Sequence, residues 1–208
     1  VSLESGELLG PVRLGAGLRS VGLLEERAIL TQPRAVLAVD EEGAVVWQAR
    51  LPAERVAAAI DVAKRRVLVT LAGGGLCVVD GASGKAYRPF PLGAEPAGEP
   101  TPAPGGALVG TADGRLVLRW SKVRWSAKLP APLRGQPRIH RDRVYAAAGK
   151  WLVALTLEEG QELWRTELPG LGLSPVVERD RLYVASEDGA LLALDRSGKV
   201  RWRFFCEG

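Results

Sequence analysis

The chain has 208 residues, of which 47% are hydrophobic and 25% charged, a balance typical of globular proteins rather than disordered or fibrous ones. One histidine, His140, and two cysteines argue against histidine-based catalysis, a disulfide scaffold and a cysteine-rich metal site. The net charge is +4 and the basic residues are scattered, which disfavours nucleic-acid binding. No apolar run approaches the roughly 18 residues that a membrane span requires, and no signal peptide is visible at the start. Because the chain begins with Val1 and contains no methionine, we expect a processed or trimmed product.

A turn glycine followed four residues later by tryptophan recurs along the chain at intervals of 37 to 41 residues. The clearest copies pair Gly43 with Trp47, Gly160 with Trp164, and Gly198 with Trp202. Less regular copies pair Ser121 with Trp125, Gly84 with Arg88, and, in a degenerate form, Gly6 with Gly10. A second marker stands four residues after each tryptophan position: Leu14, Leu51, Leu92, Leu129, Leu168 and, in the last copy, Cys206.

The residues between the two markers alternate in character. Trp47, Ala49 and Leu51 would face one way, while Gln48 and Arg50 would face the other. A period of two residues predicts a half-buried β-strand, because successive side chains of a strand point to opposite faces.

Each repeat contains three further strand patterns. β-rich runs begin at Arg27, Arg66, Gly106, Arg143 and Arg181, and turns such as Asp113-Gly114 and Asp188-Gly189 follow two of them. Third runs cover 36–39, 76–79, 116–118, 152–155 and 191–194. A fourth, weaker strand precedes the β-rich run and is marked by Pro100, Pro137 and Pro175 in three copies.

Four short antiparallel strands in about 40 residues predict an all-β fold, a β-propeller of about five four-stranded antiparallel blades. We expect one domain over 1–208, with blades at 15–51, 52–92, 93–129, 130–168 and 169–208. Residues 1–14 would form an extra N-terminal strand, and the C-terminal strand would occupy the fifth blade.

These repeats resemble the quinoprotein-dehydrogenase-like, or PQQ-repeat, propeller family, whose blade pattern is roughly Ala-x-Asp-x-x-Thr-Gly-x-x-x-Trp. Ala38-Val39-Asp40 leads to Gly43 and Trp47, and Ala193-Leu194-Asp195 leads to Gly198 and Trp202, both with a turn one residue short. Val78-Val79-Asp80 leads to Gly84 at full length, and Ala154-Leu155-Thr156 leads to Gly160 and Trp164. The third repeat departs most from this pattern, because Ser121 follows Leu118-Arg119-Trp120 directly, without the intervening turn residues.

The resemblance implies a choice between two branches of the family. Quinone-dependent dehydrogenases bind quinone and Ca²⁺ with an adjacent cysteine pair, which this chain lacks, and they are much longer. The chain looks more like the non-catalytic branch, which includes the outer-membrane assembly subunit BamB and propeller sensor domains. We therefore expect no enzyme activity, no cofactor and no metal. The resemblance also favours a bacterial, extracytoplasmic location, either periplasmic or at the cell surface.

The repeated tryptophans are expected to pack between blades, whereas Trp120 and Trp151 lie outside the repeat register. We therefore predict that the residues that contact a partner are among five candidates: Trp120, Trp151, Arg138, His140 and Arg141. Asp40, Asp80 and Asp195 precede tight turns and are expected to bind backbone amides there. Cys77 and Cys206 are expected to be buried and unlinked, because they belong to non-adjacent blades.

The function that we predict is a non-catalytic scaffold that binds a protein partner. The alternative is a small-ligand or ion sensor that uses the central channel, where His140 and its neighbouring arginines could hold an anion. Nucleic-acid binding and enzyme activity remain weaker alternatives.

Overall fold

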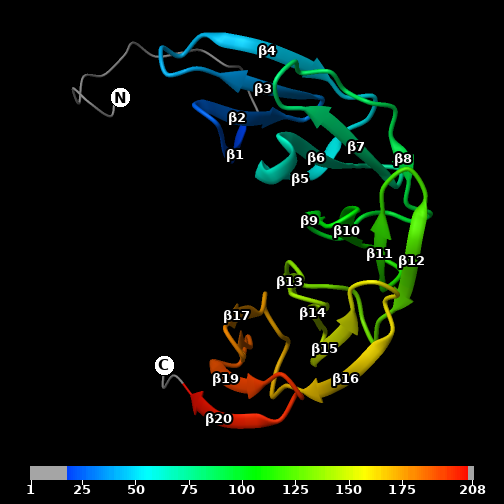
Figure 1. Cartoon of the computed structure of the whole chain (residues 1–208), viewed down its shortest axis with the longest axis vertical. Helices are drawn as coiled ribbons and strands as arrows, with labels where there is room; N and C mark the ends of the chain where they lie inside the picture. Colours follow the sequence, from blue (N-terminus) through cyan, green and yellow to red (C-terminus); the bar gives the residue numbers. More distant parts are fainter. Residues whose placement is uncertain (1–17, 206–208) are drawn as a thin grey trace. The chain divides into compact units, whose positions relative to one another are not determined.

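The computed structural model describes residues 18–205, and it contains five four-stranded antiparallel sheets (Figure 1). In each sheet the strands lie side by side in the order in which they occur in the chain. The all-β prediction is therefore confirmed. The predicted strand at 1–14 and Cys206 lie outside the described residues.

The chain divides into two compact units, Val1–Pro91 and Leu92–Gly208. The first unit contains two sheets, and a single turn of 3-10 helix, η1 (Val62–Lys64), links two of its strands. Sheet 1 consists of β1 (Arg19–Leu24), β2 (Arg27–Gln32), β3 (Ala35–Val39) and β4 (Val45–Arg50). Sheet 2 consists of β5 (Arg55–Asp61), β6 (Arg66–Leu71), β7 (Gly75–Asp80) and β8 (Phe90–Pro91).

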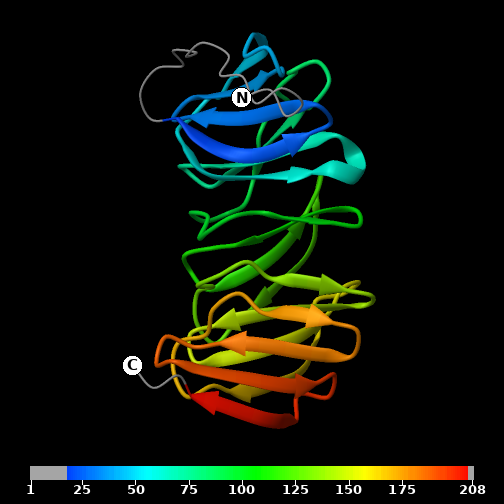
Figure 2. The same ribbon diagram turned by 90° about the vertical axis from the view of Figure 1, so that its left-hand side faces the viewer.

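The second unit contains the other three sheets (Figure 2). Sheet 3 consists of β9 (Thr101–Ala103), β10 (Gly106–Gly110), β11 (Arg115–Arg119) and β12 (Val123–Lys128). Sheet 4 consists of β13 (Arg138–His140), β14 (Arg143–Ala148), β15 (Trp151–Thr156) and β16 (Glu162–Glu167). Sheet 5 consists of β17 (Val176–Glu178), β18 (Arg181–Ala185), β19 (Ala190–Asp195) and β20 (Val200–Phe205).

The first strand of each sheet in the second unit is short for a local reason. β9, β13 and β17 each have three residues and begin immediately after Pro100, Pro137 and Pro175. Proline has no N–H to donate to the ladder, so it is tolerated before or in an edge strand, as Pro102 within β9 also is, but not in a central strand. The proline-marked weak strands of the sequence are thus confirmed as short edge strands.

The outer strand of sheet 2 differs from the other outer strands. β8 has only two residues, and an isolated bridge between Val79 and Ala86 carries the rest of the pairing. Pro89 and Pro91 remove ladder donors from this segment, and Arg88 occupies the tryptophan position and is exposed. This irregular outer strand is the last element of the first unit, which ends at Pro91.

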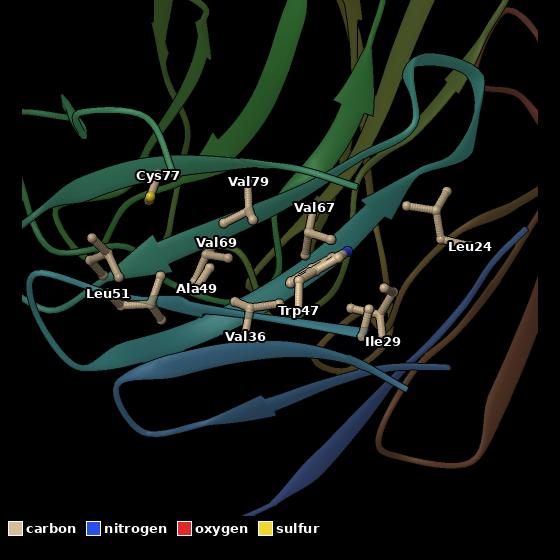
Figure 3. Packing of buried hydrophobic residues seen from close by; sticks show 12 residues of the cluster. Leu24, Ile29, Val36, Trp47, Ala49, Leu51, Val67, Val69, Cys77 and Val79 are labelled. Carbon is tan, nitrogen blue, oxygen red and sulfur yellow. The ribbon is translucent and has the colours of Figure 1, made fainter. Parts of the chain in front are cut away.

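The repeated tryptophans connect neighbouring sheets within each unit. In the first unit Trp47 reaches from β4 to sheet 2, where its indole Nε1 donates a hydrogen bond of 3.0 Å to the Gly81 carbonyl. Around it the facing sides of sheets 1 and 2 share one apolar cluster (Figure 3). That cluster includes Leu24, Ile29, Val36, Val67, Val69, Cys77 and Val79.

The same connection recurs twice in the second unit. Trp125 donates to the Leu157 carbonyl at 2.9 Å, which joins sheet 3 to sheet 4. Trp164 donates to the Arg196 carbonyl at 2.8 Å, which joins sheet 4 to sheet 5. Trp202 differs, because it lies on the last sheet and remains 43% exposed. The expected packing role therefore holds for three of the repeated tryptophans and not, within the described residues, for Trp202.

The turn aspartates and Cys77 occupy the predicted environments. A carboxylate oxygen accepts a backbone N–H in each turn: Ala44 donates to Asp40 at 2.7 Å, Ser83 to Asp80 at 2.8 Å and Ser197 to Asp195 at 2.8 Å. Cys77 is fully buried and free, and desolvation raises the pKa of its thiol to about 11. This thiol is a packing element rather than a nucleophile.

Candidate functional site

The strongest candidate surface is formed by hairpin turns at one end of sheets 4 and 5. We call it the turn surface and define it by the β13–β14 turn (141–142), the β17–β18 turn (179–180) and Arg196 in the β19–β20 turn. Arg141 and Arg179 adopt left-handed backbone conformations, with φ of 55° and 53°. Glu25 and Arg65, in the turns between the first two strands of sheets 1 and 2, adopt it as well, with φ of 58° and 51°, so the conformation is a feature of the repeated hairpin turn.

A network of ion pairs holds the turn surface together. The Arg196 guanidinium contacts two carboxylates, Asp142 at 3.2 Å and Asp180 at 3.7 Å. Arg141 pairs with Asp180 at 3.2 Å, which links the first hairpin turns of the two sheets. These side chains are more than a quarter exposed, so each pair contributes little to stability by itself, but the shared partners fix the geometry of the surface.

The Arg196 backbone takes part in the same network. Its carbonyl accepts the Trp164 indole N–H at 2.8 Å and the Arg143 Nη1 at 2.6 Å. The tryptophan that packs sheet 4 on sheet 5 therefore also anchors the residue that bridges the exposed carboxylates. The charged surface is supported by buried structure directly beneath it.

Sequence reasoning identified Arg141 but missed Asp142, Asp180 and Arg196. A signal for the first two was present, because the tripeptide Arg-Asp-Arg occurs at 141–143 and again at 179–181, in the same position of consecutive repeats. The bridging role of Arg196 had no such signal, since it depends on how two sheets meet.

His140 lies in β13, immediately before the turn surface. Its side chain is half-buried, and its Nε2 has no hydrogen-bond partner among the described residues. That nitrogen is itself a buried atom, so a bound molecule would reach it only if the ring moved. The position of His140 beside the turn surface, and not this nitrogen, keeps it among the contact candidates.

Of the remaining contact candidates, Trp120 lies at the same end of the sheets as the turn surface. Trp120 lies in the β11–β12 turn of sheet 3 and is half-buried. The corresponding turn of sheet 4 contains Leu157, which accepts the Trp125 indole, so the two turns are neighbours at the same end of the sheets. Trp120 therefore lies at the same end as Arg141.

Trp151 and Arg138 lie elsewhere. Trp151 begins β15, at the opposite end of sheet 4 from Arg141, and packs against the apolar cluster between sheets 3 and 4. The Arg165 guanidinium lies 6.0 Å from the centre of its ring. Arg138 is exposed on the edge strand β13, opposite Tyr145 in the ladder. The five candidates thus do not form one site.

A hollow of about 540 Å³ opens in the second unit, at the opposite end of the sheets from the turn surface. Its polar side chains already pair with one another or with neighbours: Gln136 with Glu99, Arg134 with Glu187 at 2.6 Å, and the Ser174 hydroxyl with the Gln136 N–H at 2.9 Å. Groups that are mutually satisfied offer little to a ligand, which favours a structural role for this hollow.

Within the part of the chain that the structure describes, no three histidine, cysteine, aspartate or glutamate side chains group together in a way that could hold a metal ion. Over residues 18–205, no helix has the length and apolar character needed to cross a membrane.

Solved structures with a similar fold were found, although no curated protein matches the chain. BamB from Moraxella catarrhalis is 19% identical, with a TM-score of 0.56 over 90% of this chain and 76% of that protein. The computationally designed Ika8 protein is 13% identical, with a TM-score of 0.75 over 88% of this chain and 59% of the design. The Pan2 WD40 domain of Neurospora crassa is 12% identical, with a TM-score of 0.69, and this chain covers 60% of its length.

These likenesses establish the fold, and they confirm the prediction of a β-propeller built from four-stranded blades. The sequence comparison goes further. The family model described as outer membrane protein assembly factor BamB matches residues 1–87 and 148–208, which together exceed half of the chain. The repeated Asp/Thr, Gly and Trp positions that connect the sheets lie largely within these matched segments. This chain therefore belongs to the BamB family of PQQ-repeat β-propellers.

Proposed function

We propose that this chain is a non-catalytic β-propeller scaffold that binds a protein partner through its turn surface. The observation that carries the proposal is the group of arginines at that surface: Arg141 and Arg196 share ion pairs with its carboxylates, and Arg179 is exposed beside them. Arg141 and Arg179 stand in left-handed turns, and the Arg196 network fixes the carboxylates between them. Arginine is enriched at protein interfaces, and side chains ordered before binding lose less entropy on binding.

The description of the matching family model also supports this proposal. That model is described as an outer membrane protein assembly factor, and we take from this description that the chain contacts other proteins. We extend this to an extracytoplasmic location in a bacterium, either periplasmic or at the cell surface. We also propose that residues 1–208 act as one propeller domain.

The contact residues that we propose are Trp120, His140 and Arg141, because all three lie at the turn-surface end of their sheets. Arg179 joins them as a residue that the sequence did not single out. Trp151 and Arg138 stay predictions as contact residues, because their positions in sheet 4 lie away from this end.

Site-specific photo-crosslinking in the native host tests the proposal. A benzophenone amino acid replaces Arg141 in one version of the protein and Lys150, an exposed residue in the β14–β15 turn at the opposite end, in a matched control. We expect the 141 probe to trap one defined protein of the cell envelope and the 150 probe to trap none. The charge reversals Arg141→Glu and Arg179→Glu should abolish its co-purification, whereas Lys150→Glu should not.

Equal crosslinking at both ends, or a trapped protein whose binding survives both reversals, would contradict the turn surface as the interface. The rival function is a small-ligand sensor, as the sequence left open. Saturable binding of a small metabolite by calorimetry, together with no protein crosslink at either position, would favour the sensor instead.

A further inference from the structure

In sheet 1 most arginines and all the carboxylates lie at opposite ends of the strands. The ladder pairs Ala35 with Arg50, and Arg34 directly precedes Ala35. β1 begins at the same end with Arg19, so three arginines share this end of the sheet. The carboxylates of sheet 1 lie in the turns at the other end: Glu25, Glu26, Asp40, Glu41 and Glu42.

A fourth arginine from sheet 2 lies at the same end. Arg55 begins β5, and its backbone N–H donates to the Pro33 carbonyl, next to Arg34, at 2.8 Å. Partial burial of its guanidinium, and then the nearby positive charge of Arg19, lower the pKa of Arg55 from its ordinary value. Its buried Nε has no hydrogen-bond partner among the described residues. We call Arg19, Arg34, Arg50 and Arg55 the basic end.

Within residues 18–205, no carboxylate lies within ion-pair distance of the basic end. The ion pairs of the first unit that the structure describes are both at the other end: Arg65 with Glu25, and Arg66 with Asp61. Like charges that lie close together disfavour each other's charged form. An anion bound at the basic end would relieve this repulsion.

A hollow of about 570 Å³ opens beside two of these arginines, Arg34 and Arg50. The other polar side chains that line it are the amides of Gln32 and Gln48 and the carboxylate of Glu54. Gln48 and Arg50 are two residues apart on β4, so they point to the same face of the sheet. The hollow therefore offers charged and polar groups to a ligand, which is what a binding site requires.

Backbone hydrogen bonds fix the segments that carry these side chains. The Leu51 N–H donates to the Arg34 carbonyl at 2.9 Å, and the Ala72 N–H donates to the Glu54 carbonyl at 2.8 Å. Arg50 is the last residue of β4 and is paired in the ladder. A site on ordered backbone loses less entropy when a ligand binds than a site on a free loop does.

We propose that the basic end binds a phosphate monoester of a polyol, such as a sugar phosphate or glycerol 3-phosphate. Arg34 and Arg50 hold the phosphate, and Gln48 and Glu54 accept hydrogen bonds from the hydroxyl groups. The guanidinium fork matches pairs of phosphate oxygens. A phosphate monoester carries a charge of about −1.5 to −2 at pH 7, which neutralises a group of arginines better than one carboxylate does. The proposal does not rest on the partner binding at the turn surface.

Nuclear magnetic resonance of the arginine Nε–H groups in the whole chain tests the proposal, with glycerol 3-phosphate as the probe. We expect saturable shifts at Arg34 and Arg50, and an affinity that falls as the salt concentration rises. Glycerol should give no shifts, because it has no phosphate. Inorganic phosphate should bind more weakly than the ester, because it has no polyol to contact Gln48 and Glu54.

Substitutions locate the binding. Arg34→Ala and Arg50→Ala should each weaken the affinity about 10-fold or more, the usual effect of losing hydrogen bonds to a charged group. The matched control, Arg88→Ala, removes an exposed arginine of the same unit that does not line the hollow, and should keep wild-type affinity. Glu54→Ala should lose the preference for the ester over inorganic phosphate. Far-ultraviolet circular dichroism checks the fold of each variant.

Three results would overturn the proposal: no saturable binding of glycerol 3-phosphate, an affinity that both arginine variants leave unchanged, or inorganic phosphate that binds as tightly as the ester. Phosphatidylglycerol vesicles and a decaglutamate peptide are the rival probes. If either binds through Arg34 and Arg50 more tightly than glycerol 3-phosphate, the site serves a membrane surface or an acidic protein instead. None of these results bears on the turn surface, which crosslinking at position 141 tests separately.

Discussion

Each repeated tryptophan joins two sheets through both its apolar ring and its single polar atom. The rings of Trp47 and Trp125 are more than nine-tenths buried, and their indole N–H groups are satisfied by carbonyls of the next sheet. A buried tryptophan without such an acceptor would contribute much less to the stability of the fold, because an unpaired buried donor costs about 1–3 kcal/mol. The turn carbonyl is therefore as much a part of the contact as the apolar cluster.

Replacing Trp125 by alanine should lower the free energy of unfolding by about 3–5 kcal/mol, the usual range for emptying a large aromatic site in a core. The matched control is Trp202→Ala, where the ring is 43% exposed and the expected loss is about 1 kcal/mol or less at a concentration at which the protein is monomeric. Urea denaturation followed by circular dichroism measures both. Equal losses would show that the repeated position, and not burial against the next sheet, determines the contribution.

The turn aspartates act on the scale of single hydrogen bonds. The Ser197 hydroxyl donates to Asp195 at 2.6 Å, and this bond, with the backbone N–H groups of Lys199 and Ser197 and nearby Arg201, lowers the pKa of Asp195 to about 2. The ordinary value for aspartate is about 3.9. A carboxylate whose pKa is depressed in the folded state stabilises the fold above its unfolded pKa, and this contribution disappears as the pH falls from about 4 toward 2.

Ser197→Ala should therefore raise the pKa of Asp195 toward its ordinary value, because the hydroxyl is the largest cause of the shift. Carboxyl-carbon nuclear magnetic resonance titration of the native protein measures the change directly. Ser126→Ala, an exposed serine on β12, serves as the control and should leave the Asp195 titration unchanged. A pKa that stays near 2 in the Ser197 variant would mean that the backbone donors and Arg201 maintain it without the hydroxyl.

At the scale of elements, the turn between the third and fourth strands must fit the ring of the preceding sheet. Gly160 has φ of 70°, and a Cβ there would lie 2.4 Å from Trp125. Gly73, in the β6–β7 turn, has φ of 85° but nothing within 4 Å of an added Cβ. Both glycines adopt a left-handed backbone conformation, but only Gly160 also lies against a neighbouring sheet. Comparing substitutions at the two positions therefore distinguishes the cost of backbone strain from the cost of a steric clash with that sheet.

Gly160→Ala should be more destabilising than Gly73→Ala. Both variants carry the strain of a left-handed alanine, about 1–2 kcal/mol, but only the first also overpacks Trp125, which adds about 1–3 kcal/mol. Thermal and urea unfolding of the two variants provide the comparison. Indistinguishable stabilities would show that the turn can move away from the indole without loss.

At the scale of the whole molecule, stability comes from contacts between consecutive sheets. In the second unit, one apolar cluster joins sheets 3 and 4 and another joins sheets 4 and 5. Repeat proteins of this kind are stabilised by the sum of repeat and nearest-neighbour terms. A unit with two such clusters contains the main source of its own stability.

The fragment 92–208 should therefore fold by itself, with a β-sheet circular dichroism spectrum and a cooperative thermal transition. Hydrogen exchange should show strong protection in β14 and β15, which lie between two clusters. The fragment 130–208 lacks sheet 3 and exposes Val144, Val153 and Leu155, so it should be clearly less stable. An unfolded 92–208 fragment would show that the second unit depends on the first.

Much of the architecture followed from local patterns. Period-two alternation, turn glycines and the three prolines predicted which segments are strands and where they end, because strand faces and turn conformations depend on residues close in sequence. The tryptophan-to-glycine register also predicted which residues would pack between sheets. The turn aspartates were predicted for the same reason, since their partners lie within four residues.

The sequence by itself therefore determined the repeat, the four-stranded blade and the propeller class. Only the tertiary structure decided the environment of each repeated position, because that depends on the sheet that covers it. Trp164 and Trp202 are equivalent in sequence, yet sheet 5 covers the first while the second stays 43% exposed. The bridge from Arg196 to Asp142 and Asp180 likewise joins two repeats, and it exists only because the turns of sheets 4 and 5 come together at one end.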